Sequence, residues 1–206
     1  HNINVSGGSD RSRYLFGFDY FDQKGILLYN FFKRYTARVN TEFNIKKNIR
    51  IGQNLQLSAS QTNGAGLNDE GTEIANSYRA QTIVPVFNIK GDYAGSRGAN
   101  LGNGGNPYAA RVRGKDNRGN NYSIFGNMYA EVDFLKHFTA RTSFGGSISN
   151  DNYYNYTFQS YENAENNSGT SFTEGSSFFR DWTWTNQLTY KNTFGDNDIV
   201  ALAGTE

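Results

Sequence analysis

The chain has 206 residues, of which 36% are apolar, 19% charged and 16% aromatic, with a formal net charge of +1. No apolar stretch approaches the ~18 residues of a transmembrane helix, and the balanced charge argues against a nucleic-acid-binding surface. The absence of cysteine excludes disulfides, thiolate metal sites and cysteine nucleophiles.

The two ends of the sequence are both strand-like. Residues 2–7 begin an alternating run without a preceding leader, and residues 199–206 form an apolar run with no turn after it. We expect the chain to be cut from a longer polypeptide, although an ordinary processed protein fits the ends equally well.

Alternation with a period of two predicts about eight strands. The clearest is residues 34–46, where apolar and polar side chains alternate over thirteen residues, longer than most strands of soluble proteins. A strand that crosses a bilayer at a tilt needs ~9–11 residues, so this length favours a membrane strand. The other predicted runs are 2–7, 14–20, 49–59, 124–134, 138–148, 182–191 and 199–206.

The predicted connections alternate in length. Short turns are expected at 8–12, 46–48, 135–137 and 194–198, and long links at 22–33, 63–121 and 161–177. Short turns at one end of an up-and-down sheet and long loops at the other are typical of outer-membrane barrels. A soluble sandwich also alternates polar and apolar residues, but it has no reason to sort its loops by length.

This interpretation assigns roles to the two faces of each strand. Charged side chains on the polar face would be costly against lipid, so we expect them to face the lumen or a plug. They are Arg34, Arg38, Glu42, Glu131, Asp133 and Arg141. Amphipathic rings near the run ends suit the membrane–water interfaces, although cross-strand packing would also explain any single ring. They are Tyr20, Tyr29, Tyr122, Trp182, Trp184 and Tyr190.

The longest link, 63–121, is predicted to be an extracellular loop with a short helix that Thr72 caps. Loops of this length are uncommon unless they are functional or disordered. Ligand contacts in this chain would come from its rings and polar groups, with packing against other loops as the alternative. The candidates are Asp92, Tyr93, Asn106, Tyr108, Arg111 and Arg113.

Motifs for catalysis or cofactor binding are absent from the sequence. Neither a nucleophile elbow nor a zinc-spaced His cluster occurs, and His137 falls in a predicted turn. The glycines at 102–105 lack the Lys-Ser/Thr of a phosphate loop. We therefore expect no enzymatic activity, no cofactor and no metal.

Several segments, in order along nearly the whole chain, resemble the SusC/RagA family of TonB-dependent outer-membrane transporters. They are residues 1–8 (HNINVSGG), 20–26 (YFDQKGI), 32–40 (FKRYTARVN), 105–107 (GNP), 127–136 (NMYAEVDFLK), 188–195 (LTYKNTFG) and 201–206 (ALAGTE). The likeness is weakest in 63–104 and 150–180. Each motif alone is weak, but together and in this order they are specific.

The resemblance implies that residues 1–206 are an all-β, antiparallel transmembrane segment, about eight strands of a barrel of about 22. The signal peptide, TonB box, plug and later strands of the family are missing from this chain. Such proteins sit in the outer membrane of Gram-negative bacteria and import oligosaccharides, or peptides in the RagA branch. TonB supplies the energy, and a SusD-like lipoprotein covers the mouth. Two alternatives remain at this point: a complete eight-stranded barrel with an adhesive or structural role, and a secreted glycan-binding β-sandwich.

Overall fold

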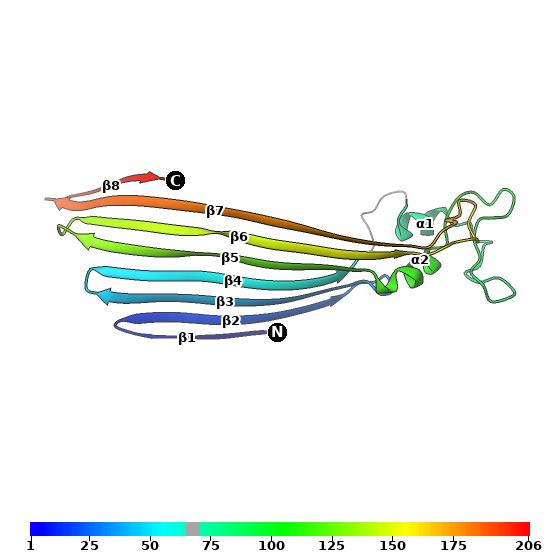
Figure 1. Cartoon of the computed structure of the whole chain (residues 1–206), viewed down its shortest axis with the longest axis horizontal. Helices are drawn as coiled ribbons and strands as arrows, with labels where there is room; N and C mark the ends of the chain where they lie inside the picture. Colours follow the sequence, from blue (N-terminus) through cyan, green and yellow to red (C-terminus); the bar gives the residue numbers. More distant parts are fainter. Residues whose placement is uncertain (65–70) are drawn as a thin grey trace.

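The computed structural model describes residues 1–64 and 71–206, and its architecture is one antiparallel sheet in which each strand pairs with the next along the chain (Figure 1). β1 and β8 form the two edges, so the sheet is an open arc, which confirms the predicted all-β antiparallel fold. The strands are β1 (Asn2–Ser9), β2 (Ser12–Lys24), β3 (Phe31–Lys46), β4 (Ile49–Asn63), β5 (Arg118–Phe134), β6 (Phe138–Thr157), β7 (Ser171–Phe194) and β8 (Asn197–Thr205).

The register of the sheet divides the side chains into two faces. Ala37 of β3 pairs with Leu57 of β4, Leu57 with Ile124 of β5, and Ile124 with Ile148 of β6. Directly paired residues point to the same side, so the apolar members of the alternating runs collect on one face, called here the apolar face. The residues between them form the opposite, polar face.

The connections are sorted by length, as the sequence predicted. The four short turns lie together at the left of Figure 1, and all the longer connections lie at its right, called here the loop end. The link between β2 and β3 is shorter than the predicted 22–33, because both strands continue to Lys24 and Phe31. Asp22 and Lys33 looked like loop residues, but they pair across the ladder as opposite charges.

The loop end carries the helices. α1 (Glu73–Arg79) starts as predicted at Thr72, whose side chain accepts a hydrogen bond from the backbone N–H of Ala75. A second helix, α2 (Pro107–Arg113), continues into a 3₁₀ turn, η1 (Gly114–Asp116), and was not predicted. Its start has the usual chemistry, with Pro107 in the first turn and Asn106 as the N-cap. None of the helices in the described ranges is long and apolar enough to span a membrane.

The described part of the chain has almost no apolar core. Ala109 is its only buried hydrophobic residue, and rings such as Phe16, Phe144 and Trp182 are about half exposed or more. The accessible surface is 14482 Å², whereas a globular monomer of this mass exposes about 9,700 Å². The sheet is therefore a single layer whose two faces both remain available to other material.

The short turns are staggered along the strand direction. Ser12, beside the β1–β2 turn, lies in the same row of paired residues as Phe43 and Ile51, and this row continues to Asn186 on β7. From Asn186, β7 runs on to Phe194 before it turns. Each successive hairpin thus reaches further from the loop end, which is the stagger of strands that tilt in a barrel wall.

Candidate functional site: a pocket at the loop end

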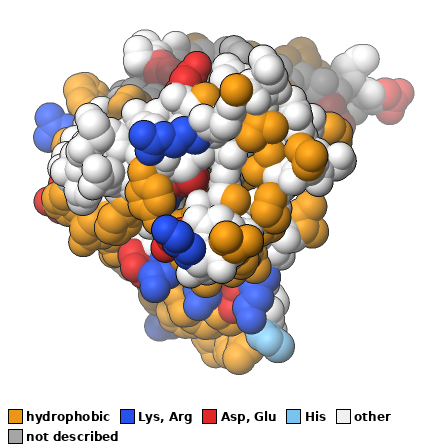
Figure 2. Space-filling view, turned by 90° about the vertical axis from the view of Figure 1, so that its right-hand side faces the viewer, with side chains coloured by type: hydrophobic (Ala, Val, Ile, Leu, Met, Phe, Trp, Pro, Cys, Tyr) orange, Lys and Arg blue, Asp and Glu red, His pale blue; other side chains and the backbone are white. Residues whose placement is uncertain are grey.

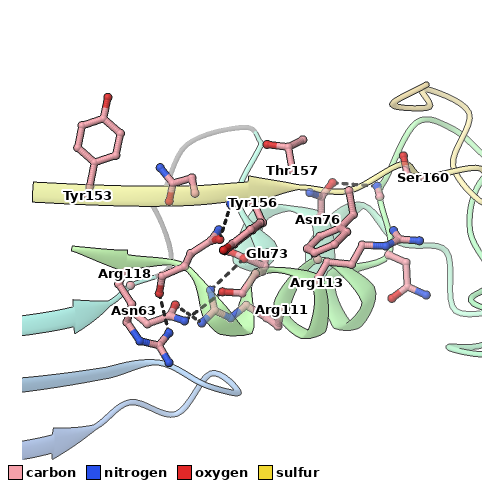
Figure 3. Close-up of a pocket in the computed structure, with 18 of the residues that line it drawn as sticks. Asn63, Glu73, Asn76, Arg111, Arg113, Arg118, Tyr153, Tyr156, Thr157 and Ser160 are labelled. Atoms are coloured by element: carbon pink, nitrogen blue, oxygen red, sulfur yellow. Dashed lines mark hydrogen bonds and ion pairs between the residues drawn. The ribbon is translucent and has the colours of Figure 1, made fainter. Parts of the chain in front are cut away.

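A pocket of about 530 Å³ lies where the ends of β4, β5 and β6 meet α1, α2 and the 158–163 segment (Figure 3). Thr62 and Gly119 form part of its floor, and Tyr153 and Asn155 contribute from β6. By register these residues belong to the polar face, so the pocket opens above that face. Seen from the loop end, charged side chains lie among polar ones across the middle, and hydrophobic ones lie on the flanks (Figure 2).

Arg111 holds the β2–β3 link, α1 and the end of β4 together beneath this pocket. Its side chain is 6% exposed, and its Nε donates to the carbonyl oxygen of Leu28 at 2.8 Å. One terminal nitrogen lies 3.3 Å from Glu73 of α1, and the other donates to Asn63 of β4 at 3.2 Å. Asn63 in turn donates to the carbonyl oxygens of Gly114 and Lys115. A buried guanidinium group with a partner at each of its three nitrogens holds these segments together and has a structural role.

The pair Arg113–Glu162 joins α2 to the segment between β6 and β7. The two contacts measure 2.6 and 3.1 Å in a bidentate arrangement, and the Glu162 side chain is 1% exposed. Burial by itself would raise the pKa of Glu162, but hydrogen bonds from Arg113 and from backbone N–H groups outweigh it and hold that pKa below its ordinary value. The hydrogen bond to Glu162 also raises the pKa of Arg113.

The predicted ligand candidates fall into two groups. Tyr93, Tyr108 and Arg113 come together: the Arg113 guanidinium lies 5.1 Å from the centre of the Tyr93 ring, and both tyrosine rings pack on Phe87. Arg111 and Asn106 are nearby, but both are buried. Asp92 is exposed in the small turn that closes the Phe87–Tyr93 bridge.

Asn106 has a structural explanation for its place in the "GNP" segment. Its side-chain oxygen accepts from the backbone N–H of Ala109, and its amide donates to the carbonyl oxygens of Val86 and Ala94 at 2.9 and 2.7 Å. All its polar atoms are engaged within the protein. Its role as a ligand contact stays a prediction, and the contacts that the structure shows are internal.

Two polar side chains of β6 that were not among the predicted site residues also line the pocket. Tyr153 and Asn155 are exposed residues of β6 on the polar face, whereas Tyr156 alternates to the other face, where its ring packs on Phe172 at 4.9 Å (Figure 3 shows the opposite directions of the two tyrosines). The predicted strand ends at Ile148, because residues 149–157 are a run of polar and tyrosine residues without clear alternation. In the structure, β6 continues to Thr157. The rising share of tyrosine in that run was the available signal.

The charged residues predicted for the lumen all lie on the polar face, and four of them form one network near the short turns. Arg50 pairs with both Glu131 and Asp133, and Arg141 lies 3.5 Å from Glu131. The network extends through Tyr129, whose hydroxyl donates to Glu42 at 2.7 Å. Arg50 and Tyr129 were not among the predicted residues, although alternation places both on this face.

The remaining two predicted lumen residues lie closer to the loop end. Arg34 and Arg38 line a separate hollow of about 290 Å³, together with Asp19 and asparagines of β1. Arg38 donates to Gln56 on the neighbouring strand at 2.9 Å. Whether any of the six contacts a plug stays a prediction.

Three of the predicted interface rings, Tyr190, Tyr20 and Tyr122, take two levels on the sheet, and Tyr29 lies in the link between β2 and β3. Tyr190 packs on Phe138 beside the short turns, with ring centres 5.0 Å apart. Tyr20 packs on Tyr35 toward the loop end, and Tyr122 belongs to the same row of paired residues. Trp182 and Trp184 lie mid-strand in β7, because that strand continues to Ser171, further than the alternation showed.

The described ranges contain no group of three or more His, Asp and Glu side chains that could hold a metal ion. His137 is exposed in the β5–β6 turn, beside the carbonyl oxygen of Lys191.

Comparison with curated proteins finds two relatives from Formosa agariphila. TonB-dependent receptor P3 is 28% identical over 97% of this chain, and TonB-dependent receptor P39 is 27% identical over 98% of it. The chain spans only about a fifth of the length of these relatives, 20% and 19%. No family model matches the sequence.

Comparison with solved structures finds the same arrangement of strands. The RagAB peptide importer in its open-open state aligns with 98% of this chain at a TM-score of 0.74 and 22% identity, and the chain covers 23% of that protein. The ferric-catecholate receptor Fiu of E. coli K12, in its open form, aligns with 98% of this chain at 0.54 and 13% identity, and the chain covers 31% of it. The relatives and the shared fold confirm the resemblance that the motifs indicated.

Proposed function

We propose, from its likeness to TonB-dependent receptors along almost its whole length, that this chain forms part of the wall of a TonB-dependent outer-membrane importer. The observation that carries the proposal is the two-faced single layer, with one apolar face, one polar face and connections sorted by length. A sheet built this way needs lipid on one side and polar material on the other. The same arrangement occurs in the RagAB importer at a TM-score of 0.74.

The alternatives explain the structure less well. A β-sandwich needs a second layer to cover the apolar face, and the described residues form one sheet only. A closed eight-stranded barrel needs β1 to pair with β8, and these are the two edges of the open arc. A segment of a wider barrel wall needs neither a second layer nor pairing between β1 and β8.

The proposed cargo is an oligosaccharide. Tyr153 offers a ring face at the loop-end pocket, and Asn155, two residues further along the same face of β6, offers an amide, a combination that suits stacking and hydrogen bonding to a sugar. A peptide is the second candidate, favoured by the structural likeness to a peptide importer. The predicted contacts Asp92, Tyr93, Tyr108 and Arg113 extend the same surface outward.

The proposed partners follow from the same assignment. A SusD-like lipoprotein would cover the loop end, and TonB would act through a part of the protein outside this chain. The polar face, with its network of Arg50, Glu131 and Arg141, would face a plug or water inside the lumen.

The test uses the whole protein that contains this chain, in its own host. Deleting its gene should abolish uptake of fluorescent oligosaccharides or of fluorescent peptides, and collapsing the proton gradient should have the same effect on the wild type. Cell fractionation should place the protein in the outer membrane. Unchanged uptake of both cargo classes in the deletion strain would refute the importer, and loss of cell adhesion alone would favour a structural barrel.

A further inference from the structure

We propose that the apolar face carries a binding groove for a net-negative, phosphate-bearing lipid, with Arg180 holding the headgroup. This inference rests on the proposed membrane setting and goes beyond transport. The groove has a volume of about 630 Å³, within the ~300–1,000 Å³ of small-molecule sites. Its walls are the half-buried Leu55 and the exposed side chains Ile124, Met128, Phe144, Ile148 and Trp182.

A pair of glycines makes the floor of the groove. Gly126 of β5 pairs directly with Gly146 of β6, so two neighbouring positions on this face lack side chains. A Cβ atom at Gly126 would overlap the carbonyl oxygen of Asn54, and one at Gly146 would overlap that of Asp181. The floor of the groove is therefore fixed by the close approach of the backbones, and side chains form only its walls.

The rim toward the loop end carries one cation. Arg180 pairs with Ile148, and this row of paired residues continues through Ile124, Leu57 and Ala37, all of them apolar. The other charged side chains on this face, Lys33 and Glu174 among them, lie in rows nearer the loop end, except Lys46, which lies beside the β3–β4 turn, away from the groove. The Arg180 side chain is exposed and forms no hydrogen bond or ion pair with any described residue. An unpaired cation above an apolar hollow complements an anionic headgroup above an acyl chain.

The height of Arg180 on the wall agrees with this assignment. Arg180 lies about ten residues before Tyr190, whose ring marks the lower aromatic level, and β-strands rise ~3.3 Å per residue. With the 35–45° tilt of barrel strands, this gives about 25 Å, the usual height of the apolar band. Arg180 thus reaches the upper headgroup level, with Trp182 just below it.

The groove is complete within this chain. Its residues come from β4, β5, β6 and β7, and each of these strands has both of its neighbours in the sheet. The floor and rim therefore do not depend on strands outside the chain.

The test uses the full protein in nanodiscs, with a bimane probe on Met128→Cys as the only labelled cysteine. Brominated-acyl phosphatidylglycerol or phosphatidylcholine is added at increasing mole fraction, and quenching of the probe is measured. Half-maximal quenching should need about fivefold less phosphatidylglycerol than phosphatidylcholine. Arg180→Gln should remove this preference, and Arg180→Lys should keep it.

Two matched controls define the site. Lys136→Gln removes an exposed cation at the short-turn end and should leave the preference intact, and a probe on Phe16→Cys, on the same face outside the groove, should show none. Equal quenching by both lipids at residue 128, or a preference that survives Arg180→Gln, would overturn the proposed groove. Either result leaves the proposed function standing if uptake in cells is normal. Protection of the probe from both lipids, as when a second copy covers the face, would overturn it too. Loss of uptake bears on the proposed function instead.

Discussion

At the scale of single residues, the loop end depends on buried charges that are fully paired. Arg111 joins the β2–β3 link, α1 and β4 through Leu28, Glu73 and Asn63. Removing one partner of a buried pair costs about 3–5 kcal/mol, because the other charge stays buried without compensation.

We therefore expect Arg111→Ala to loosen the loop end by about that amount while the strands stay paired. Hydrogen exchange should speed up in α1 and at Asn30, and remain slow in the middle of β3. Lys90→Ala, at an exposed position, is the matched control. Unaltered hydrogen exchange in α1 would show that the Arg111 contacts contribute nothing to the stability of the loop end.

Glu162 gives the loop end a dependence on pH. Its pKa is lowered in the folded protein, chiefly because the hydrogen bonds from Arg113 and the backbone overcome the effect of burial. Its contribution to stability is therefore complete above the ordinary glutamate pKa, ~4.3, and is lost as the pH falls through the lowered value. The segment 158–163 should detach from α2 below about pH 4, seen as faster hydrogen exchange there. Glu162→Gln should show the fast exchange already at neutral pH.

At the scale of elements, the middle strands need glycine where their backbones approach closely. Gly146→Ala should disturb the pairing of β6 with β7, since the added methyl group meets the backbone of Asp181 and Trp182. Overpacking of this kind costs about 1–3 kcal/mol.

The measurement for Gly146→Ala is the fraction of full protein that runs as the compact, heat-modifiable form on an SDS gel. That fraction should fall for this variant. It should not change for Gly169→Ala, because a Cβ atom there meets nothing within 4 Å. Equal fractions for the two variants would contradict the steric argument.

The sorting of connections predicts a topology. An epitope tag inserted at Gly91, in the 64–117 connection, should be recognised by antibody on intact cells. A tag at Gly195, in the β7–β8 turn, should be recognised only after the outer membrane is opened. The reverse pattern would invert the proposed orientation of the wall.

The alternating strands and short turns could be predicted from the sequence because a period of two fixes which face each side chain takes. The strand ends could not, since Asp22 and Lys33 look like loop residues until they pair with each other. α2 was missed because its helix is short and its cap, Asn106, lies in a glycine-rich stretch. The pocket depends on Arg111 and Glu162 meeting partners far along the chain, which no local pattern encodes.

At the scale of the whole molecule, this chain lacks the buried apolar surface that makes a soluble domain stable. It exposes 14482 Å², and Ala109 is the only buried hydrophobic residue in the described part. We expect the isolated chain to aggregate in detergent-free buffer and to gain strand signal in circular dichroism only when detergent micelles are added. Size-exclusion chromatography without detergent should show no folded monomer, and a monomeric, strand-rich peak would contradict this expectation.

Because the sheet is a single layer without an apolar core, it also limits the stage at which this chain can fold. A domain with an apolar core can fold in water, but the rings of this sheet stay exposed, so in the proposed membrane setting their favourable transfer out of water happens only on contact with lipid. Folding and insertion would therefore occur together, because the free energy that favours the fold comes largely from moving the exposed rings into lipid. In the proposed membrane setting, the chain would cross the aqueous compartment before it folds, and a chaperone that binds unfolded chains would keep it from aggregating on the way.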